Sequence, residues 1–303
     1  MENKTPLIPM QDFFRNPEKS SFKISPNGEH IAYMKPWKAR MNVFVMDMNT
    51  KKEVRLTSSQ ERGIYWFAWL NNNRIGYIKD EGGNENMHFY AVNIDMSNEI
   101  DLTPFENVQA RIIDDLEDDP NHIIMGLNKR NPQIHDPYRI NVNDGKMDMI
   151  AENPGNISEW MTDHDGKLRI AITSDGVNTS LLYRDKESDG FKTILTTDFK
   201  VSVAPLFFTF DSKNLYVASN RGRDKTAIFE FDLNKSKEGK LIFEHDEVDV
   251  SGLMYSRKRK VLTGVSYTVA KNEMVFFDTL REGLQQKLEE KLPGYEVGIT
   301  SFS

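Results

Sequence analysis

Cysteine is missing from the sequence of 303 residues. Disulfide bonds, thiolate metal sites and a cysteine nucleophile are therefore excluded. We expect a cytoplasmic protein, because a chain without disulfides fits a reducing compartment, although a processed periplasmic protein would also fit. No apolar run approaches the roughly 20 residues of a membrane-spanning helix, and residues 1–6 lack the apolar core of a secretory signal. No membrane partner is predicted.

Positive charge is also in short supply. The chain has 39 lysines and arginines against 46 aspartates and glutamates, a net charge of −7. This balance disfavours binding to nucleic acid. The densest basic cluster is Arg257-Lys258-Arg259-Lys260, directly before an apolar run. We interpret the cluster as the exposed tip of a hairpin, so no nucleic-acid partner is predicted.

Metal-binding patterns are scarce. The run Asp163-His164-Asp165-Gly166 begins like a calcium loop, but the glutamate expected at the twelfth position is missing. We expect a hairpin turn there and a solvated acidic face at residues 114–119. The histidines show no zinc-type spacing, so structural roles are expected and no metal-ligating or cofactor-binding residue is predicted. They are His30, His88, His122, His135, His164 and His245.

A serine nucleophile is not evident either. The elbow of α/β-hydrolases needs the pattern Gly-x-Ser-x-Gly, because glycines permit its tight strand-to-helix turn. The nearest match, Gly264-Val265-Ser266-Tyr267-Thr268, lacks the second glycine and lies in a strand-like run. No catalytic residue is predicted.

What the chain does contain is a repeat. A turn rich in Pro, Asn, Asp or Gly, such as Ser25-Pro26-Asn27-Gly28, precedes a short apolar strand. The strands after successive turns begin 44 to 48 residues apart, and four-stranded propeller blades repeat about every 40 to 50 residues. These strands begin near Ile31, Ile75, Ile123, Ile170, Leu215 and Val261.

Each period holds a second apolar strand, and several hold a third. One four-stranded sheet cannot bury both of its faces alone, so neighbouring sheets must supply the core. We therefore predict an all-β fold, a seven-bladed β-propeller with six full blades and an incomplete seventh. The second strands are expected at 43–46, 89–92, 138–142, 180–183, 227–231 and 274–277, and third strands at 54–57, 100–103 and 241–243.

The predicted organisation has two parts, a leader segment at residues 1–21 and the propeller at residues 22–303. In the leader, Asp12 is expected to cap a short helix that ends before Pro17. Phe13 and Phe14 are expected to pack on the propeller rim, with docking onto another domain as the alternative. Polar connectors at 79–86 and 219–224 are the loops where we expect contacts with a ligand or partner.

The end of the chain changes character. Leucines recur every fourth residue from 280 to 292, which predicts a helix at about 280–292. Residues 295–302 then have the composition of a strand, the first of the seventh blade. The edge of this open blade is expected to favour self-association.

Four segments carry a resemblance to a known family. They are Asp12-Phe13-Phe14-Arg15-Asn16-Pro17-Glu18-Lys19, which leads into the first turn, and residues 83–92, 131–139 and 219–224. Together, over nearly the whole chain, they resemble the N-terminal propeller of the prolyl oligopeptidase family of serine peptidases. The acylaminoacyl-peptidase or dipeptidyl-aminopeptidase-like branch is the most similar.

The resemblance implies a propeller that gates and helps bind short peptides for an α/β-hydrolase domain with a Ser-Asp-His triad. No position here matches the nucleophile, the acid or the histidine, so the catalytic domain is expected to be missing and this chain alone to be inactive. The glutamate pair of the dipeptidyl-peptidase branch has no matching motif, and Glu289-Glu290 is interpreted as a solvated pair.

Two other functions stay open. A stand-alone module resembling TolB-type propellers would recognise a protein partner on one face, but it predicts a closed ring. A propeller hydrolase with paired carboxylates would need a separation set by its reaction, which the sequence does not supply. We favour the oligopeptidase propeller.

Overall fold

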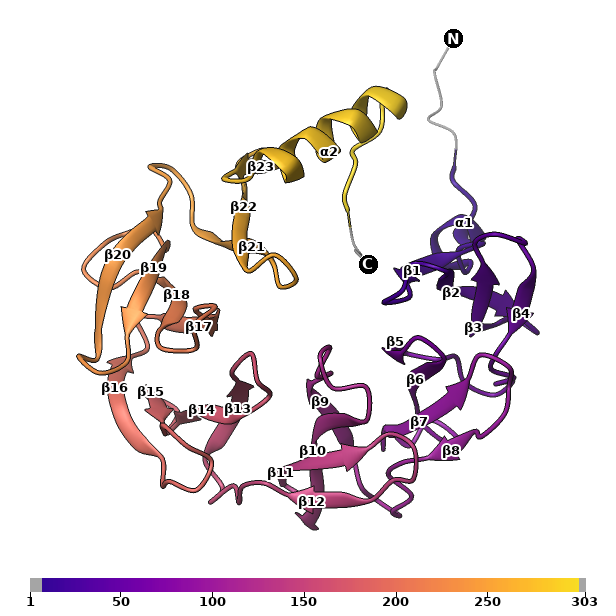
Figure 1. Cartoon of the computed structure of the whole chain (residues 1–303), viewed down its shortest axis with the longest axis horizontal. Coiled ribbons are helices and arrows are strands. Elements are labelled where there is room, and N and C mark those ends of the chain that lie inside the picture. The colour runs from indigo at the N-terminus through magenta and orange to yellow at the C-terminus, as the bar shows by residue number, and fades with distance from the viewer. Residues whose placement is uncertain (1–6, 300–303) are drawn as a thin grey trace. The chain divides into compact units, whose positions relative to one another are not determined.

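Antiparallel strands make up nearly all regular structure in the computed structural model, which describes residues 7–299 (Figure 1). These residues form 23 strands and two helices. They divide into two units, the first ending at Met149 and the second running from Ile150 to Ile299. The predicted all-β class is confirmed. Neither helix in the described range is long and apolar enough to cross a membrane.

The first unit contains three four-stranded sheets. Strand order follows the chain, and each strand runs antiparallel to the next. In Figure 1 the first strand of each sheet lies on the concave side of the row and the fourth on the convex side. The strands are β1 (Ser20–Ile24), β2 (His30–Trp37), β3 (Arg40–Asp47), β4 (Glu53–Arg55), β5 (Trp66–Asn71), β6 (Arg74–Lys79), β7 (His88–Asn93), β8 (Ile100–Asp101), β9 (Ala110–Asp114), β10 (His122–Asn131), β11 (Ile134–Asn141) and β12 (Met147–Met149).

The second unit continues the pattern with two four-stranded sheets and one three-stranded sheet. Its last regular element is the helix α2 (Thr279–Lys291). The strands are β13 (Ile157–Thr162), β14 (Leu168–Ser174), β15 (Asn178–Tyr183), β16 (Lys192–Asp198), β17 (Val203–Phe208), β18 (Leu215–Ser219), β19 (Ala227–Asp232), β20 (Lys237–Phe243), β21 (Val250–Ser256), β22 (Val261–Thr268) and β23 (Asn272–Phe276).

The sequence repeat corresponds to the second strand of each sheet. The strands β2, β6, β10, β14, β18 and β22 begin within two residues of the predicted positions, and the predicted second apolar runs form the following strands. Except for β23, which lies at an edge of the sixth sheet, the strands of each pair are central in their sheets, so side chains on both faces are buried, as at Ala32 and Tyr33. That burial explains their nearly continuous apolar sequences. The sheets are consistent with the blades of a β-propeller.

Apolar side chains fill the space between consecutive sheets of a unit. One core cluster joins Val43 and Val45 of β3 to Ile75 of β6, and another joins Phe89 of β7 to Ile123 of β10. Equivalent clusters join the sheets of the second unit. At about 25 cal/mol per Å² of apolar surface, this burial is the main stabilising contribution.

Polar side chains also tie one sheet to the next. In the first unit, Arg74 on β6 donates from Nε to the carbonyl oxygen of Val142, which follows β11, at 2.9 Å. In the second unit, Nη1 of Arg169 on β14 donates to the carbonyl oxygen of Ser212 at 2.7 Å. A buried carbonyl would otherwise lose its hydrogen bond to water, so these contacts fix the spacing of the sheets.

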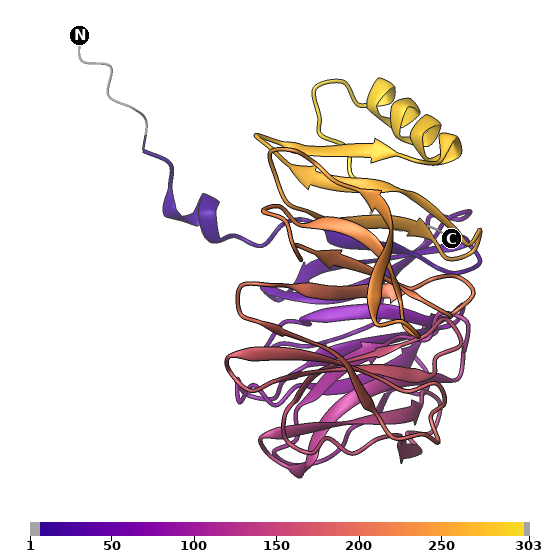
Figure 2. The ribbon, with the colours of Figure 1, turned by 90° about the vertical axis from the view of Figure 1, so that its left-hand side faces the viewer.

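The sheet of the sixth repeat is incomplete, so the prediction of six full blades is wrong. Its sheet has three strands within the described residues, and α2 follows β23 where a fourth strand would come. Figure 2 shows the yellow helix alongside this sheet. The helix contacts β23, whose outer edge pairs with no strand among the described residues. The helix itself lies within one residue of its predicted bounds.

Both ends of the described chain differ from expectation. Residues 295–299 form no strand, and the rest of the predicted strand at 295–302 lies outside the described residues. Near the start, α1 (Met10–Phe14) has Pro9 as its N-cap, so Asp12 lies inside the helix instead of capping it. Phe13 and Phe14 are 67% and 79% exposed, so the expected packing on a rim is wrong.

Candidate functional site

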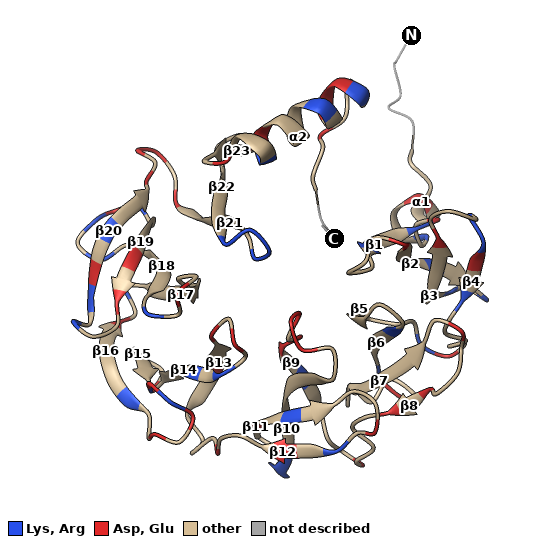
Figure 3. Cartoon of the chain, in the orientation of Figure 1, with Lys and Arg blue, Asp and Glu red and all other residues tan. Residues whose placement is uncertain are grey.

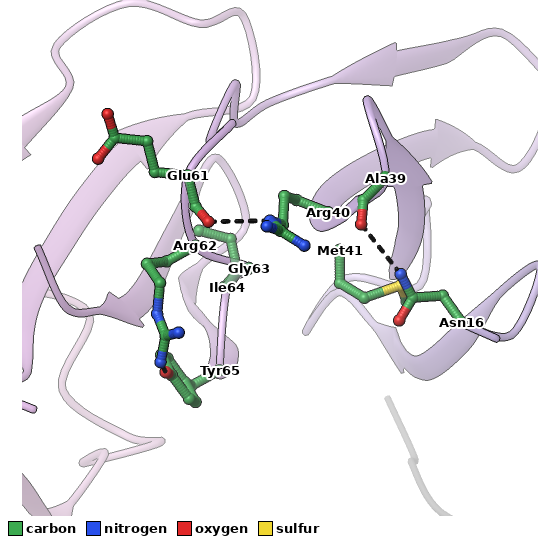
Figure 4. Close-up of a pocket in the computed structure, with 9 residues that line it drawn as sticks. All are labelled: Asn16, Ala39, Arg40, Met41, Glu61, Arg62, Gly63, Ile64 and Tyr65. Atoms are coloured by element: carbon green, nitrogen blue, oxygen red, sulfur yellow. Dashed lines mark hydrogen bonds between the residues drawn. The ribbon is translucent and has the colours of Figure 1, made fainter. Parts of the chain in front are cut away.

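A pocket of about 340 Å³ lies in the first unit (Figure 4). It is formed by the β2–β3 hairpin, the connection from β4 to β5 and a residue that precedes β1. Its size is within the range of small-ligand sites. The lining residues are Asn16, Ala39, Arg40, Met41, Glu61, Arg62, Gly63, Ile64 and Tyr65.

The β2–β3 hairpin forms one wall. Trp37 pairs with Arg40, and the two residues between them, Lys38 and Ala39, have φ values of 47° and 63°. Positive φ at both positions is typical of a type I′ turn, whose twist matches that of the strands. The turn places Arg40 at the start of β3, where its Nε donates to the carbonyl oxygen of Glu61 at 2.8 Å. Figure 4 shows this contact and a hydrogen bond from Asn16 to the carbonyl of Ala39.

Asn42 holds the β4–β5 connection against the hairpin. Its Nδ2 donates to the carbonyl oxygens of Arg40 and Ser59 at 3.1 and 3.0 Å. Its Oδ1 accepts from the Thr57 hydroxyl and the Ser59 backbone N–H at 2.9 and 2.8 Å. The side chain is fully buried. A buried amide with all these bonds formed gives the loop one conformation.

The opposite wall depends on Arg62. Its Nη2 donates to the hydroxyl of Tyr65 at 2.6 Å, and its Nε donates to Oδ1 of Asp80 at 3.3 Å. The hydrogen bond to Tyr65, followed by the bond and charge of Asp80, raises the pKa of Arg62. Asp80 in turn accepts from the backbone N–H of Glu85 at 3.3 Å. The guanidinium is therefore held from both sides and stays charged.

The pocket combines positive charge with an apolar floor. Two guanidinium groups line it, while the carboxylate of Glu61 points away from Arg40 in Figure 4. Met41 and the buried Ile64 contribute apolar surface. None of the nine described residues that line the pocket is a serine, cysteine or histidine. The two arginines can donate hydrogen bonds to a carboxylate or carbonyl group.

A second pocket, of about 380 Å³, lies one repeat later in the same unit. Here His88 Nδ1 and Asp101 Oδ2 are 2.7 Å apart, and burial together with the charges of Asp101 and Glu81 raises the pKa of the neighbouring Tyr90. Three carboxylates line this pocket, so its charge is opposite to that of the first. The lining residues are Glu81, Asn84, His88, Asp101, Pro104, Phe105, Glu106 and Asn107.

The hairpin turn predicted at Asp163 and the strand position predicted for Ser266 are both present. Asp163 starts the β13–β14 turn, and its Oδ1 accepts from the backbone of Asp165 and Lys167, so this is a hairpin turn. Ser266 lies in β22 opposite Met274, within a sheet rather than at an elbow. Within residues 7–299 no group of three or more His, Asp or Glu side chains is placed to hold a metal ion.

The charged motifs mostly form ion pairs inside the chain. Arg223 pairs with Glu244 at 2.6 Å. The basic cluster is the β21–β22 turn, visible as a blue loop in Figure 3, and Arg259 binds Asp278 through two hydrogen bonds of 2.7 and 2.8 Å. Of the two loops predicted for ligand contacts, 79–86 contributes to the second pocket and carries Asp80. The loop at 219–224 lines neither pocket.

Sequence reasoning missed the residues of the first pocket. Arg40, Arg62 and Tyr65 belong to no motif, and their proximity depends on how consecutive sheets pack. A signal was available in Trp37-Lys38-Ala39-Arg40, because two residues between two apolar runs mark a tight hairpin.

Comparison with known proteins identifies relatives along the whole chain. No protein-family model matches. The dipeptidyl aminopeptidase BIII of Pseudoxanthomonas mexicana is 29% identical over 301 residues, which cover 96% of this chain and 42% of that protein. The dipeptidyl peptidase family member 6 of Caenorhabditis elegans is 22% identical over 98% of this chain and 42% of its own length. The chain's relatives are prolyl oligopeptidase-family peptidases.

Solved structures agree in fold. A structure from a study of two prolyl endopeptidases superimposes with a TM-score of 0.59 at 12% identity, over 85% of this chain and 40% of that one. The dipeptidyl peptidase 4 of Porphyromonas gingivalis gives 0.55 at 14% identity, over 86% and 45%. The resemblance drawn from the sequence motifs is confirmed. The chain spans about two fifths of the length of the curated relatives it matches.

Proposed function

We propose that this chain is the propeller of a serine oligopeptidase, and that it gates and helps bind short peptides for an α/β-hydrolase domain outside these 303 residues. The observation that carries the proposal is the pattern of coverage. Two peptidases match over at least 96% of this chain but only 42% of their own length. The sequence also has no Gly-x-Ser-x-Gly segment, so this chain alone should not hydrolyse peptides.

We further propose that the repeated sheets form part of a seven-bladed propeller. In this proposal the chain consists of a leader at residues 1–21 and the propeller at residues 22–303. Six consecutive sheets with one strand order support this architecture. A seventh sheet would bury the face of the β21–β23 sheet that carries the half-buried Met254, Met274 and Phe276.

The leader is the proposed contact with the catalytic domain. All its described large apolar residues are exposed, an unusual concentration for a water-facing segment. A partner domain would remove this surface from water. The residues are Leu7, Ile8, Met10, Phe13 and Phe14.

The pocket at the β2–β3 hairpin is the proposed place of peptide contact. Its guanidinium groups and Tyr65 hydroxyl can donate to peptide oxygens, and Met41 and Ile64 offer apolar contact. A cytoplasmic location and self-association through residues 295–302 stay predictions. Sedimentation of the purified chain over a concentration series tests the second.

Two experiments test the proposed function: sequencing of the gene beyond codon 303 and an assay with dipeptidyl substrates. We expect the coding sequence beyond codon 303, in frame or after a frameshift, to encode a Gly-x-Ser-x-Gly segment. We also expect the purified chain to release no aminomethylcoumarin from dipeptidyl substrates. Turnover by the chain alone would contradict the proposal, and so would an intergenic region directly after codon 303.

A further inference from the structure

We propose that the pocket at the β2–β3 hairpin is a carboxylate site that receives a terminal carboxylate next to an apolar side chain. The ligand class is the C-terminal residue of a short peptide, an identification that rests on the proposed function. A small free apolar acid shares the same chemistry. The site distinguishes an end of a peptide from its interior.

The first support is the fixed position of Arg62. Its side chain is 44% exposed, but its Nε is bound to Asp80, whose side chain is 0% exposed. A buried carboxylate pays a large desolvation penalty without a cation, so this pair holds Arg62 in place. With Nε donating to Asp80 and Nη2 to Tyr65, the planar guanidinium keeps its Nη1 hydrogens and one Nη2 hydrogen to donate to a carboxylate.

The second support is Arg40, which enters the pocket from the hairpin. Its Nε is engaged by the carbonyl oxygen of Glu61, a neutral acceptor that leaves the positive charge uncancelled. The Glu61 carboxylate points away (Figure 4). Two arginines thus line the pocket, of which Arg62 is paired with Asp80 and Arg40 is bound to a carbonyl oxygen. The charge of Arg40, which is paired with no carboxylate in the described part of the chain, attracts an anion.

The third support is the floor of the pocket. Ile64 is buried and its backbone N–H donates to the carbonyl oxygen of Met41 at 2.9 Å, so the two side chains belong to a rigid part of the wall. Of the two, Met41 is only partly buried and is the side chain that an apolar group beside the carboxylate would contact, whereas Ile64 packs in the core cluster beneath it. The second pocket, with Glu81, Asp101 and Glu106, repels a carboxylate and makes the first pocket the preferred place.

Calorimetric titration of the full 303-residue chain tests this site. The probes are N-acetyl-Ala-Ala-Leu, the same peptide as its C-terminal amide, N-acetylleucine and acetate. We expect the peptide acid to bind at least tenfold more tightly than the amide, and to weaken as salt is added. N-acetylleucine should bind with intermediate affinity if the peptide contributes contacts, and acetate most weakly.

Variants identify the residues. Arg40→Gln and Arg62→Gln should each weaken binding of the acid about tenfold, the loss of one charge-assisted contact. Arg62→Lys keeps the charge but loses the planar fork, so it should bind weakly too. Arg221→Gln, at an exposed position in the second unit, is the matched control and should bind like the parent chain. Circular dichroism confirms that each variant is folded.

Equal affinity for acid and amide would overturn the carboxylate site, as would unchanged binding by both Arg40→Gln and Arg62→Gln. Acetate binding as tightly as the peptide would overturn the role of the apolar floor and of the peptide. These failures leave the proposed oligopeptidase function standing, because the coding sequence and the substrate assay decide that separately.

Discussion

Arg62 and Asp80 form an ion pair between the connection of two consecutive sheets and the end of a strand in the second of them. Arg62 lies in the connection between β4 and β5, and Asp80 directly follows β6. The carboxylate is fully buried while the guanidinium is half exposed, so the pair is anchored from its acidic side. The same carboxylate accepts the backbone N–H of Glu85 in the β6–β7 connection. One buried side chain therefore orders the walls of two neighbouring pockets.

Replacing Asp80 tests this arrangement. Asp80→Ala should lower the free energy of unfolding by about 1–3 kcal/mol, because the Glu85 N–H loses its buried acceptor. Urea unfolding measures the change, and faster amide exchange in residues 81–86 should accompany it. Asp148→Ala removes an exposed carboxylate of β12 and should change stability little. Equal effects of the two substitutions would contradict the anchoring role.

The hairpin beside the pocket carries conformational strain. Ala39 has a φ of 63°, a conformation that costs a residue with a Cβ about 1–2 kcal/mol. Ala39→Gly should therefore raise the free energy of unfolding by about 1 kcal/mol, after allowance for the greater freedom of glycine in the unfolded chain. Ala204→Gly, at an exposed position of β17, should instead destabilise. A loss of stability in Ala39→Gly would show that the turn is unstrained.

Gly264 is the glycine of the partial nucleophile-elbow match, and packing explains it. A Cβ there would lie 2.4 Å from the carbonyl oxygen of Val275 and 2.8 Å from Cε of Met254. Gly264→Ala should destabilise by about 1–3 kcal/mol, the usual range for overpacking. Gly283→Ala, in α2 with open space around it, should stabilise by about 1 kcal/mol. Thermal denaturation of both variants measures this contrast, and the same sign for both would contradict it.

Asp278 makes α2 sensitive to acid. Hydrogen bonds from Arg259 and from the backbone N–H of Arg281 lower the pKa of this N-cap carboxyl. Because the folded pKa lies below the unfolded value of about 3.9, its stabilisation is complete above that pH and is lost as the pH falls through the folded pKa. We expect the difference in melting temperature between parent and Asp278→Ala to be largest near pH 6 and to shrink below pH 4. A difference that is constant with pH would contradict this.

The sequence predicts the strands well because each central strand is buried on both faces. That burial requires continuous apolar runs such as 31–34 and 89–92, and the turns between them need Asn, Asp or Gly. The repeat can therefore be recognised from the local amino-acid composition. The three-stranded sixth sheet was not predictable from the spacing, because α2 comes after the last of the six repeats.

Relations between elements are harder to predict. The leucine pattern of α2 indicates a helix but not which face it buries. Leu280 and Leu284 are 66% and 40% exposed, whereas Arg281 and Gln285 are buried. Gln285 donates to the carbonyl oxygen of Val297 at 2.7 Å. The first pocket is equally hard to predict, because only the packing of the folded chain brings Arg40 and Arg62 to the same pocket.

Mapping a fluorophosphonate adduct tests the central claim most directly. The probe is applied to the cellular protein that contains this sequence, and mass spectrometry locates the modified serine. We predict an adduct within a Gly-x-Ser-x-Gly segment outside residues 1–303, and none on the purified 303-residue chain. A specific adduct on a serine within these residues would contradict the account.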